Sequence, residues 1–322
     1  MLAPEAVSIV TNFEIASSVA LLPPRNDSFF YPLYAKAKIN MKIYGLLGKN
    51  IHHSLSPVMH NAAFKALGIS AEYKIFDINE EKLGGFFEKL KKGEIFGCNV
   101  TMPYKEKALN FVDAASVATK TIGALNTVTR EEDELKGYNT DYQGFIKALL
   151  GFGEGDLNFK AEGKDAFIFG AGGAAKAIIY GLLTMGAKKI VIADIDNKKA
   201  EALAGYVIGK KKWNSLITVA QDEKQYNEFI SKSDLLVNAT PCGMKEDDPG
   251  LFDYSYIHEG LYVCDLIYTV ETPLIKGAKG RSAKCINGLN MLLYQAARSF
   301  EYWTNLEAPL EVMRKMLLGS VR

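Results

Sequence analysis

The chain has 322 residues, which is enough for two ordinary domains, each with its own core. Hydrophobic residues make up 48% and charged residues 23%, a globular composition, and 38 Lys and Arg against 37 Asp and Glu leave a net charge of +1. This balance gives no electrostatic reason to expect a nucleic acid or a membrane as a partner. The four cysteines form no CxxC pair, which favours a reduced, cytoplasmic setting over a disulfide framework or a zinc site.

Residues 1–40 differ from the rest of the sequence. They show no clear periodicity, Pro23 and Pro24 interrupt them, and two glutamates precede the first basic residue, Arg25, so the positive start of a signal peptide is missing. No apolar run approaches the ~20 residues that cross a bilayer. We expect residues 1–40 to be a poorly ordered appendage, translated from a start codon upstream of the natural one at Met41.

From Met41 the sequence alternates between strands and helices. Strands are expected at residues 42–48 (KIYGLLG), 71–78 (AEYKIFDI) and 95–101 (IFGCNVT). Helices are expected at residues 56–68 (SPVMHNAAFKALG), at 80–93 (EEKLGGFFEKLKKG) and from about Tyr104, and a hairpin with polar tips at 123–141. This alternation predicts an α/β fold with a largely parallel sheet.

The stretch KDAFIFGAGGAAKAIIYGLLTMGAKKIVIADID, residues 164–196, predicts a strand, a glycine turn, a helix and a second strand that ends at Asp194. In the G-x-G-x-x-G spacing of dinucleotide-binding units, the third position falls on Ala175, a small alternative to glycine. Gly170 permits the tight turn, and Gly172 lets the backbone approach a pyrophosphate that sits on the N–H groups of the helix N-terminus. A packing turn without a nucleotide is the alternative, but the complete strand–turn–helix–acid context favours a dinucleotide.

Asp194 bears on which dinucleotide binds. A carboxylate at this position accepts hydrogen bonds from both ribose hydroxyls of NAD and would face the 2′-phosphate of NADP with like charge, unless it is simply a solvated acid at a strand end. Lys198 and Lys199 could hold that phosphate or be exposed on the first turn of the next helix. We expect NAD or NADP as the cofactor, with NAD favoured, and keep Lys199 as a candidate contact.

A hydride carrier needs a second site for the hydride donor or acceptor. The candidate side chains in the first half are mostly neutral hydrogen-bonding groups, suited to a small polyhydroxylated molecule: Ser54, Ser56, Asn99, Thr101, Asn126 and Asn139. One basic and one acidic residue stand out, Lys105 and Asp141. A ketone–alcohol interconversion needs a proton at the oxygen as the hydride moves, which a lysine can carry and a carboxylate can orient.

Each of these residues also has an ordinary structural explanation. Ser54 or Ser56 could cap the helix that begins near residue 57, and Thr140 or Asp141 could cap the helix that follows them. Lys105 could be an exposed helix lysine. The four histidines show no metal-ligand spacing, so no metal site is predicted.

Seven motifs in order resemble a known family: SLSPVMHNAAF, NVTMPYK, GALNT, GYNTD, GAGGAA, VNATPCGM and INGLNMLLYQA. From about Met41 to the C-terminus the chain looks like shikimate dehydrogenase, which reversibly reduces 3-dehydroshikimate to shikimate with a nicotinamide cofactor in the chorismate route to aromatic amino acids. Seven motifs in order are a specific match, whereas each motif alone is weak.

The resemblance implies a role for each matching residue. Lys105 would be the general acid and base, with Asp141 as its partner. Besides Asp141, the substrate would be bound by Ser54, Ser56, Asn99, Thr101, Asn126, Tyr268 and Gln295. The cofactor would be bound by Gly170, Ala171, Gly172, Gly173 and Ala174 at the pyrophosphate, and by Thr240, Leu266 and Gly288 at the nicotinamide.

The resemblance also implies an architecture. A substrate domain with a mixed sheet would comprise residues 41–142 and be completed by C-terminal helices at 289–322. A Rossmann domain would comprise residues 143–288, and the active site would lie between the two. The expected partners are small molecules, and the protein would be a monomer or a homodimer.

Two departures from the family pattern affect these expectations. Many members carry Asn-Arg-Thr where this chain has Asp194-Ile195-Asp196, so the arginine that would grip the 2′-phosphate of NADP is absent. This resembles an NAD-preferring branch, some of whose members also oxidise quinate, so an NAD-dependent quinate/shikimate dehydrogenase is one alternative. The stretch DLIYTVETPL is one residue shorter than usual, which predicts a different loop near Tyr268.

A further alternative is a ligand-binding module with this fold that does not turn its ligand over. A lost Lys105 or Asp141 would favour it, and both residues are present.

Overall fold

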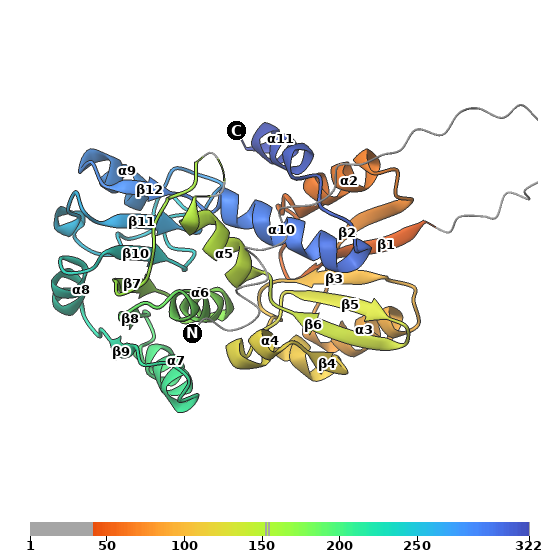
Figure 1. Ribbon diagram of the computed structural model, residues 1–322, viewed down its shortest axis with the longest axis horizontal. Coiled ribbons are helices and arrows are strands. Elements are labelled where there is room, and N and C mark those ends of the chain that lie inside the picture. The colour runs from red at the N-terminus through yellow and green to blue at the C-terminus, as the bar shows by residue number, and fades with distance from the viewer. Residues whose placement is uncertain (1–40, 152, 154, 322) are drawn as a thin grey trace, which may run out of the picture. The chain divides into compact units, whose positions relative to one another are not determined.

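The computed structural model describes residues 41–151, 153 and 155–321, which form two six-stranded sheets with helices around them (Figure 1). The expected appendage at residues 1–40 lies outside the described residues, so its nature stays a prediction. Across the described part of the chain, every helix is too short or too polar to cross a membrane.

The first sheet is mixed, as expected. Its strands are β1 (Lys42–Gly48), β2 (Ala71–Asp77), β3 (Gly97–Val100), β4 (Ala114–Ala115), β5 (Thr127–Glu131) and β6 (Glu134–Tyr138). They lie in the order β2-β1-β3-β5-β6-β4, with β5 antiparallel to both β3 and β6 and the other pairs parallel. The expected hairpin is therefore confirmed as β5 and β6.

The helices that accompany the first sheet are α2 (Ser56–Ala66), the 3-10 helix η1 (Glu80–Lys82), α3 (Leu83–Lys91), the 3-10 helix η2 (Lys107–Phe111), α4 (Val117–Ile122) and α5 (Asp141–Leu150). The expectation of a helix from Tyr104 is wrong, because Lys105 and Glu106 form a turn and only the short η2 follows. The physical reason is a long-range hydrogen bond. The Lys105 carbonyl accepts the N–H of Leu125 at 2.8 Å, whereas in an α-helix it would accept the N–H of Leu109.

The second sheet is parallel throughout and has the expected Rossmann topology. Its strands are β7 (Asp165–Phe169), β8 (Lys189–Ala193), β9 (Leu216–Val219), β10 (Leu235–Asn238), β11 (Tyr262–Asp265) and β12 (Lys284–Ile286). They lie in the order β12-β11-β10-β7-β8-β9. Counted from β7, this is the strand order of dinucleotide-binding sheets, in which ligands bind where the order reverses, here between β7 and β10.

The helices of the second sheet are α6 (Gly173–Thr184), α7 (Asn197–Gly209), α8 (Glu223–Ile230), the 3-10 helix η3 (Tyr254–Tyr256) and α9 (Pro273–Gly280). Helix α6 packs closely against the sheet, since Ala175 in its first turn is small and completely buried in the core. The turn that precedes α6 is thereby held against the sheet.

The chain ends with two helices that return to the first sheet, α10 (Leu289–Thr304) and α11 (Leu310–Ser320). Figure 1 shows α10 running alongside α5, and α11 near α2. Helix α10 contributes Tyr294 to the core beside the second sheet, and Leu293 and Phe300 to the core beside the first. This helix therefore belongs to both cores and can place side chains between them.

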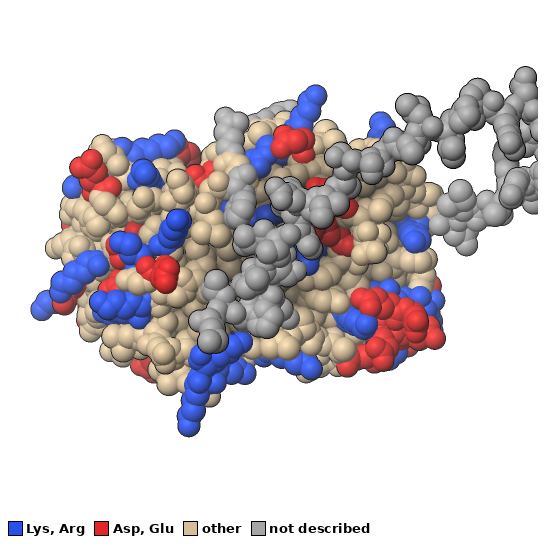
Figure 2. Space-filling model, viewed as in Figure 1, with Lys and Arg blue, Asp and Glu red and all other residues tan. Residues whose placement is uncertain are grey.

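Charge is distributed without a dominant sign. Figure 2 shows basic and acidic side chains dispersed among large neutral areas on the face in view, in keeping with the net charge of +1. This face thus presents no extended single-sign surface of the kind that attracts nucleic acid.

Candidate active site

A cavity of about 220 Å³ lies where the first sheet, the start of α6 and helix α10 meet. The residues predicted for substrate binding and proton transfer all line it: Ser54, Ser56, Asn99, Thr101, Lys105, Asn126, Asp141, Tyr268 and Gln295. Three predicted cofactor residues also line it: Ala174, Leu266 and Gly288. The other predicted cofactor residues lie outside this cavity: Gly170, Ala171, Gly172, Gly173, Asp194, Lys199 and Thr240.

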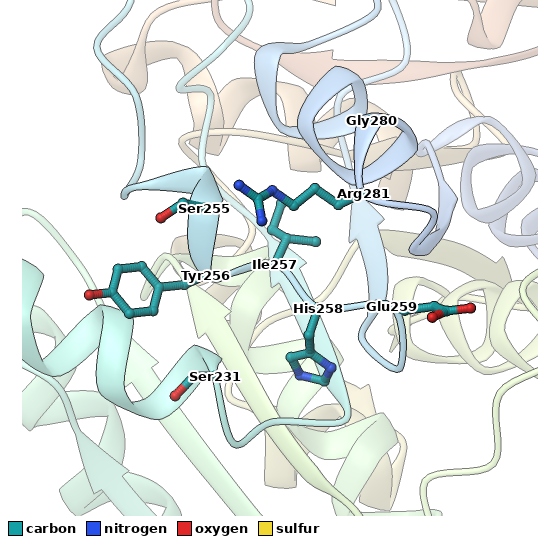
Figure 3. A pocket seen from close by; sticks show the side chains of 8 residues that line it. All are labelled: Ser231, Ser255, Tyr256, Ile257, His258, Glu259, Gly280 and Arg281. Carbon is teal, nitrogen blue, oxygen red and sulfur yellow. The ribbon is translucent and has the colours of Figure 1, made fainter.

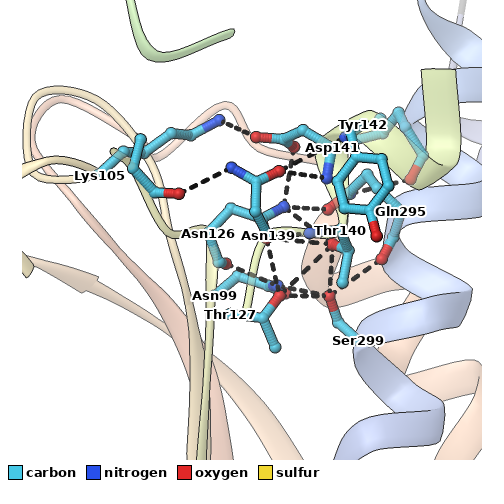
Figure 4. Close-up of polar contacts among 12 residues, drawn as sticks. Asn99, Lys105, Asn126, Thr127, Asn139, Thr140, Asp141, Tyr142, Gln295 and Ser299 are labelled. Carbon is cyan, nitrogen blue, oxygen red and sulfur yellow. Dashed lines mark hydrogen bonds and ion pairs between the residues drawn. The ribbon is translucent and has the colours of Figure 1, made fainter. Parts of the chain in front are cut away.

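Lys105 and Asp141 form an ion pair in the wall of the cavity. Lys105 Nζ lies 2.7 Å from Asp141 Oδ2, and the two side chains are 15% and 8% exposed. The second carboxylate oxygen, Oδ1, accepts a hydrogen bond from Asn126 Nδ2 at 2.8 Å (Figure 4). The carboxylate is therefore held from both sides while the ammonium faces the cavity.

The start of α5 explains why Asp141 is available for this pair. Capping of α5 by Thr140 or Asp141 is the alternative explanation for these residues, but neither caps the helix with its side chain. Asn139 takes that role, because its Oδ1 accepts the N–H groups of Asp141 at 3.1 Å and Tyr142 at 3.4 Å, and its Nδ2 donates to the Ala124 carbonyl at 2.9 Å. The carboxylate of Asp141 is thus free to turn toward Lys105.

The amide of Asn126 has only one possible orientation. Its Oδ1 accepts the backbone N–H of Thr140 at 2.7 Å, so its Nδ2 must point to the acceptors on the other side, Asp141 Oδ1 and Gln295 Oε1, the latter at 3.3 Å. Asn126 thereby connects the ion pair to helix α10. Its position supports a role in orienting Asp141 as well as the predicted contact with the substrate.

Sequence reasoning missed the polar residues behind the cavity. Asn99 Nδ2 donates to Thr127 Oγ1 at 3.1 Å and to Ser299 Oγ at 2.8 Å, while its Oδ1 accepts the hydroxyl of Tyr73 at 2.8 Å. Figure 4 shows Thr127 and Ser299 beside Asn99, from the hairpin and α10 respectively. Ser299 could have been found from the sequence, since it follows Gln295 by four residues and so shares its helix face.

Ser56 does not cap α2, whereas Ser54 does so from one position before the N-cap. The helix begins at Ser56, its N-cap position is Leu55, and no side chain there accepts a helix N–H group. Ser54 Oγ instead accepts the N–H of Ser56 and donates to Ser56 Oγ, both at 3.2 Å. Both hydroxyls line the cavity, where they can bind the oxygens of a ligand.

The turn between β7 and α6 fits a dinucleotide. Gly170 has a φ of +109°, which disfavours any side chain, and a Cβ there would lie 3.0 Å from the Ala239 carbonyl oxygen. A Cβ at Gly172 would have no neighbour within 4 Å, so this side of the turn is open to a ligand. At Gly173 a Cβ would lie 3.4 Å from Lys105 Cδ, so the helix N-terminus that would hold the pyrophosphate lies next to the ion pair.

Asp194 lies at the carboxyl end of β8, beside the glycine turn. Its Oδ2 accepts the N–H of Ala171 at 2.8 Å, and its Oδ1 accepts the N–H of Asp196 at 3.0 Å. Lys199 is 67% exposed and its Nζ lies 3.9 Å from Asp196 Oδ2, so it points along the surface of α7. Ile195, between Asp194 and Asp196, is fully exposed.

A second, more open hollow of about 650 Å³ lies at the other end of the strands of the Rossmann sheet (Figure 3). Ser231 precedes β10, His258 precedes β11 and Arg281 precedes β12, so this hollow is at the amino ends of the strands. Ligands of such sheets bind at the carboxyl ends. It is therefore separate from the candidate active site.

A Rossmann sheet with an open glycine turn, next to a cavity with a lysine–carboxylate pair, defines a dinucleotide-dependent oxidoreductase. Sequence profiles described as "Shikimate dehydrogenase substrate binding domain" and "Shikimate 5'-dehydrogenase C-terminal domain" match residues 46–128 and 288–318. The chain is 40% identical over 283 residues to the "Shikimate dehydrogenase (NADP(+))" of Methanopyrus kandleri, covering 87% of this chain and 96% of that protein. The chain belongs to the shikimate dehydrogenase family.

Solved structures agree with this assignment. Shikimate dehydrogenase from Aquifex aeolicus is 36% identical with a TM-score of 0.78, covering 86% of this chain and 98% of that one. Shikimate 5-dehydrogenase from Listeria monocytogenes, solved in complex with shikimate and NAD, is 31% identical with a TM-score of 0.79, covering 88% and 98%. The expected fold, a mixed α/β substrate-binding part and a Rossmann part, is confirmed.

Proposed function

We propose that this chain catalyses the reversible interconversion of 3-dehydroshikimate and shikimate with NAD or NADP, a step toward chorismate and the aromatic amino acids. The observation that carries the proposal is the Lys105–Asp141 pair in the wall of a polar cavity, next to the turn that would hold the dinucleotide. Family membership supports the choice of substrate, because the relatives named above carry shikimate in their names.

The residues of the cavity have different roles in the reaction. When bound, the nicotinamide supplies the hydride to the ketone carbon, or accepts it from the alcohol carbon. Lys105 donates a proton to the ketone oxygen during reduction and takes it back from the hydroxyl during oxidation. Asp141 holds the ammonium in place, and hydroxyl and amide groups such as Ser54 and Gln295 fix the oxygens of the ring.

We further propose that NAD is the favoured cofactor. Each oxygen of the Asp194 carboxylate accepts one backbone N–H group, and a carboxylate oxygen has room for a second hydrogen bond, here from a ribose hydroxyl. The 2′-phosphate of NADP would meet this negative charge, with Ile195 in place of a cation. The Listeria monocytogenes complex contains NAD, whereas the Methanopyrus kandleri relative is named for NADP(+), so both cofactors need testing.

We also propose a division into domains and a cellular location. Residues 41–142 together with 289–322 would form the substrate domain, and 143–288 the dinucleotide domain. The arrangement of the two sheets and of α10 supports this division. A cytoplasmic location is supported by the four cysteines, all of which are free thiols.

The deciding experiment follows absorbance near 340 nm, where the reduced nicotinamide absorbs, with shikimate and either NAD or NADP. A rise that depends on shikimate is expected, faster with NAD. Quinate in place of shikimate tests the broader specificity. Binding of shikimate and cofactor without any turnover would instead identify a non-catalytic ligand-binding protein, and turnover of quinate alone would reassign the substrate.

A further inference from the structure

A buried amide–carboxylate pair connects the two strands next to the cofactor site. Asn238 and Asp265 are register partners at the carboxyl ends of β10 and β11, and both are completely buried. Asn238 Nδ2 donates to Asp265 Oδ1 at 3.0 Å. Within the described parts of the chain, no lysine, arginine or histidine forms an ion pair with Asp265. This carboxylate therefore relies on neutral donors.

Asp265 organises the loop that follows β11. Its Oδ1 also accepts the N–H of Ile267 at 3.0 Å, and its Oδ2 accepts the hydroxyl of Thr272 at 2.7 Å. Thr272 in turn caps α9 by accepting the N–H of Ile275 at 3.2 Å. Burial raises the pKa of Asp265, and these hydrogen bonds oppose that shift. The loop from Leu266 to Thr272 is thus fixed at both ends by one side chain.

Asn238 organises the loop that follows β10. Its Oδ1 accepts both the N–H and the hydroxyl of Thr240, at 3.0 and 2.7 Å, and its Nδ2 donates to the Cys242 carbonyl at 3.2 Å as well as to Asp265. The oxygen must face the donors of Thr240, so the amide nitrogen must face the carboxylate. The two loops therefore keep one relative position.

Both loops form the part of the site that the nicotinamide would occupy. Leu266 and Tyr268 line the cavity. The Ala239 carbonyl oxygen lies against Gly170 of the glycine turn, and a Cβ at Gly288 would collide with the Leu266 carbonyl oxygen. These close backbone contacts leave little freedom for either loop. The loop after β11 lies three strands away from β8 in the sheet, so a shift of this loop should change the nicotinamide side of the site and leave the end of β8 at Asp194 in place.

We infer that Asn238 and Asp265 are positioning residues for the nicotinamide half of the cofactor site. Both are completely buried and lie outside the lining of the cavity, so they act by holding the loops that carry Thr240, Leu266 and Tyr268. The inference rests on the proposed function for the identity of the cofactor.

The test separates the two halves of the cofactor. In Asp265→Leu the three donors to Asp265 lose their acceptor, so the dissociation constant of NAD should rise roughly ten- to hundred-fold. The dissociation constant of ADP-ribose, which lacks the nicotinamide, should stay within about two-fold. Both are measured by calorimetry on the full chain, with NADP and 2′-phospho-ADP-ribose if that cofactor binds better. Asp265→Asn keeps one oxygen for Asn238 and Ile267 and should recover most of the affinity.

Asp234→Leu is the matched control. This carboxylate also bridges two strands, because Asp234 Oδ2 accepts the N–H of Asp165 at 2.9 Å, but it lies at the amino ends of β10 and β7, away from the site. Asp234→Leu should therefore leave the dissociation constants of NAD and ADP-ribose unchanged. If Asp265→Leu does not fold, Thr272→Val is compared with Thr272→Ser, and only the valine variant should weaken NAD more than ADP-ribose.

If Asp265→Leu weakens the binding of NAD and of ADP-ribose equally, or weakens neither, the inference is overturned. Because the readout is binding, it stays informative even if the wild-type protein binds the dinucleotide and turns over no shikimate. A lack of turnover with shikimate would count against the proposed function alone.

Discussion

The ammonium of Lys105 lies 2.7 Å from the carboxylate of Asp141, although 36 positions separate the two residues in the chain. Local backbone structure brings them together: the Lys105 carbonyl accepts the N–H of Leu125, and Asn139 caps α5 so that Asp141 need not. The pair is mostly shielded from water, which strengthens the interaction compared with a surface ion pair. A proton donor held in this way has a defined direction into the cavity.

Replacing Lys105 tests this role directly. Lys105→Ala should lower kcat by ~10²–10⁴, because the ketone oxygen loses its proton donor, while KM for shikimate changes little. Lys107→Ala is a close control, since Lys107 lies two positions away and pairs with the exposed Glu80. Steady-state kinetics with circular dichroism on both variants decides the matter. A near-normal kcat with a raised KM would make Lys105 a binding residue only.

Replacing Asp141 should affect both turnover and binding. Asp141→Asn removes the charge that holds Lys105 and leaves one oxygen to accept from both Lys105 and Asn126, so we expect kcat to fall and KM for shikimate to rise, each roughly ten-fold or more. Asp133→Asn, whose carboxylate pairs with Arg130 at the exposed tip of the hairpin, should change neither. An unchanged KM in Asp141→Asn would restrict this residue to proton transfer.

Replacing Asp194 tests the cofactor proposal. Hydrogen bonds to a charged acceptor contribute ~1.5–3 kcal/mol, so Asp194→Asn should reduce the ratio of kcat/KM for NAD over NADP by roughly ten- to hundred-fold. Asp196→Asn alters an acid two positions away that accepts the N–H of Lys198 at the start of α7, and it should leave the ratio nearly unchanged. A wild-type enzyme that already uses NADP better than NAD would refute the proposal.

Removing residues 1–40 should leave a working protein. The described residues from Met41 onward contain both sheets and every residue of the cavity. A chain that starts at Met41 is therefore expected to keep its melting temperature and its kcat, measured side by side with the full chain. Loss of either would show that the first 40 residues contribute to folding or activity.

His60 should make the protein sensitive to acid. It is buried with its ring stacked on Tyr73 at 4.4 Å between centroids, and burial lowers its pKa to about 3. In the unfolded chain the pKa is ~6.5, so between these two values the unfolded state binds one more proton. As the pH is lowered through this window, the free energy of unfolding should then fall by about 1.4 kcal/mol for each pH unit.

His60→Phe keeps a ring against Tyr73 and removes the titrating group. Urea unfolding from about pH 7 down to about pH 4 should show a smaller loss of stability with acid in the variant than in the wild type. Identical slopes for the two proteins would mean that His60 is not a source of the acid sensitivity.

Much of this protein could be predicted from the sequence, because the relevant signals are local. The glycine turn depends on residues 170–175 and the strand before them, and the hairpin on the alternation of residues 127–138. Periodicity and turn chemistry act between neighbours in the chain, so they identify these elements without knowledge of the fold. The seven ordered motifs then indicated which side chains gather in the cavity, and these side chains do line it.

Only the tertiary structure decided how those side chains are held. Lys105 lies in a turn rather than a helix because Leu125 takes its carbonyl, and Ser299 orients Asn99 from 200 positions away. The contact between Asn238 and Asp265 likewise depends on the pairing of two parallel strands. Such hydrogen bonds compete with local ones, and which of them forms depends on chain segments that only folding brings together.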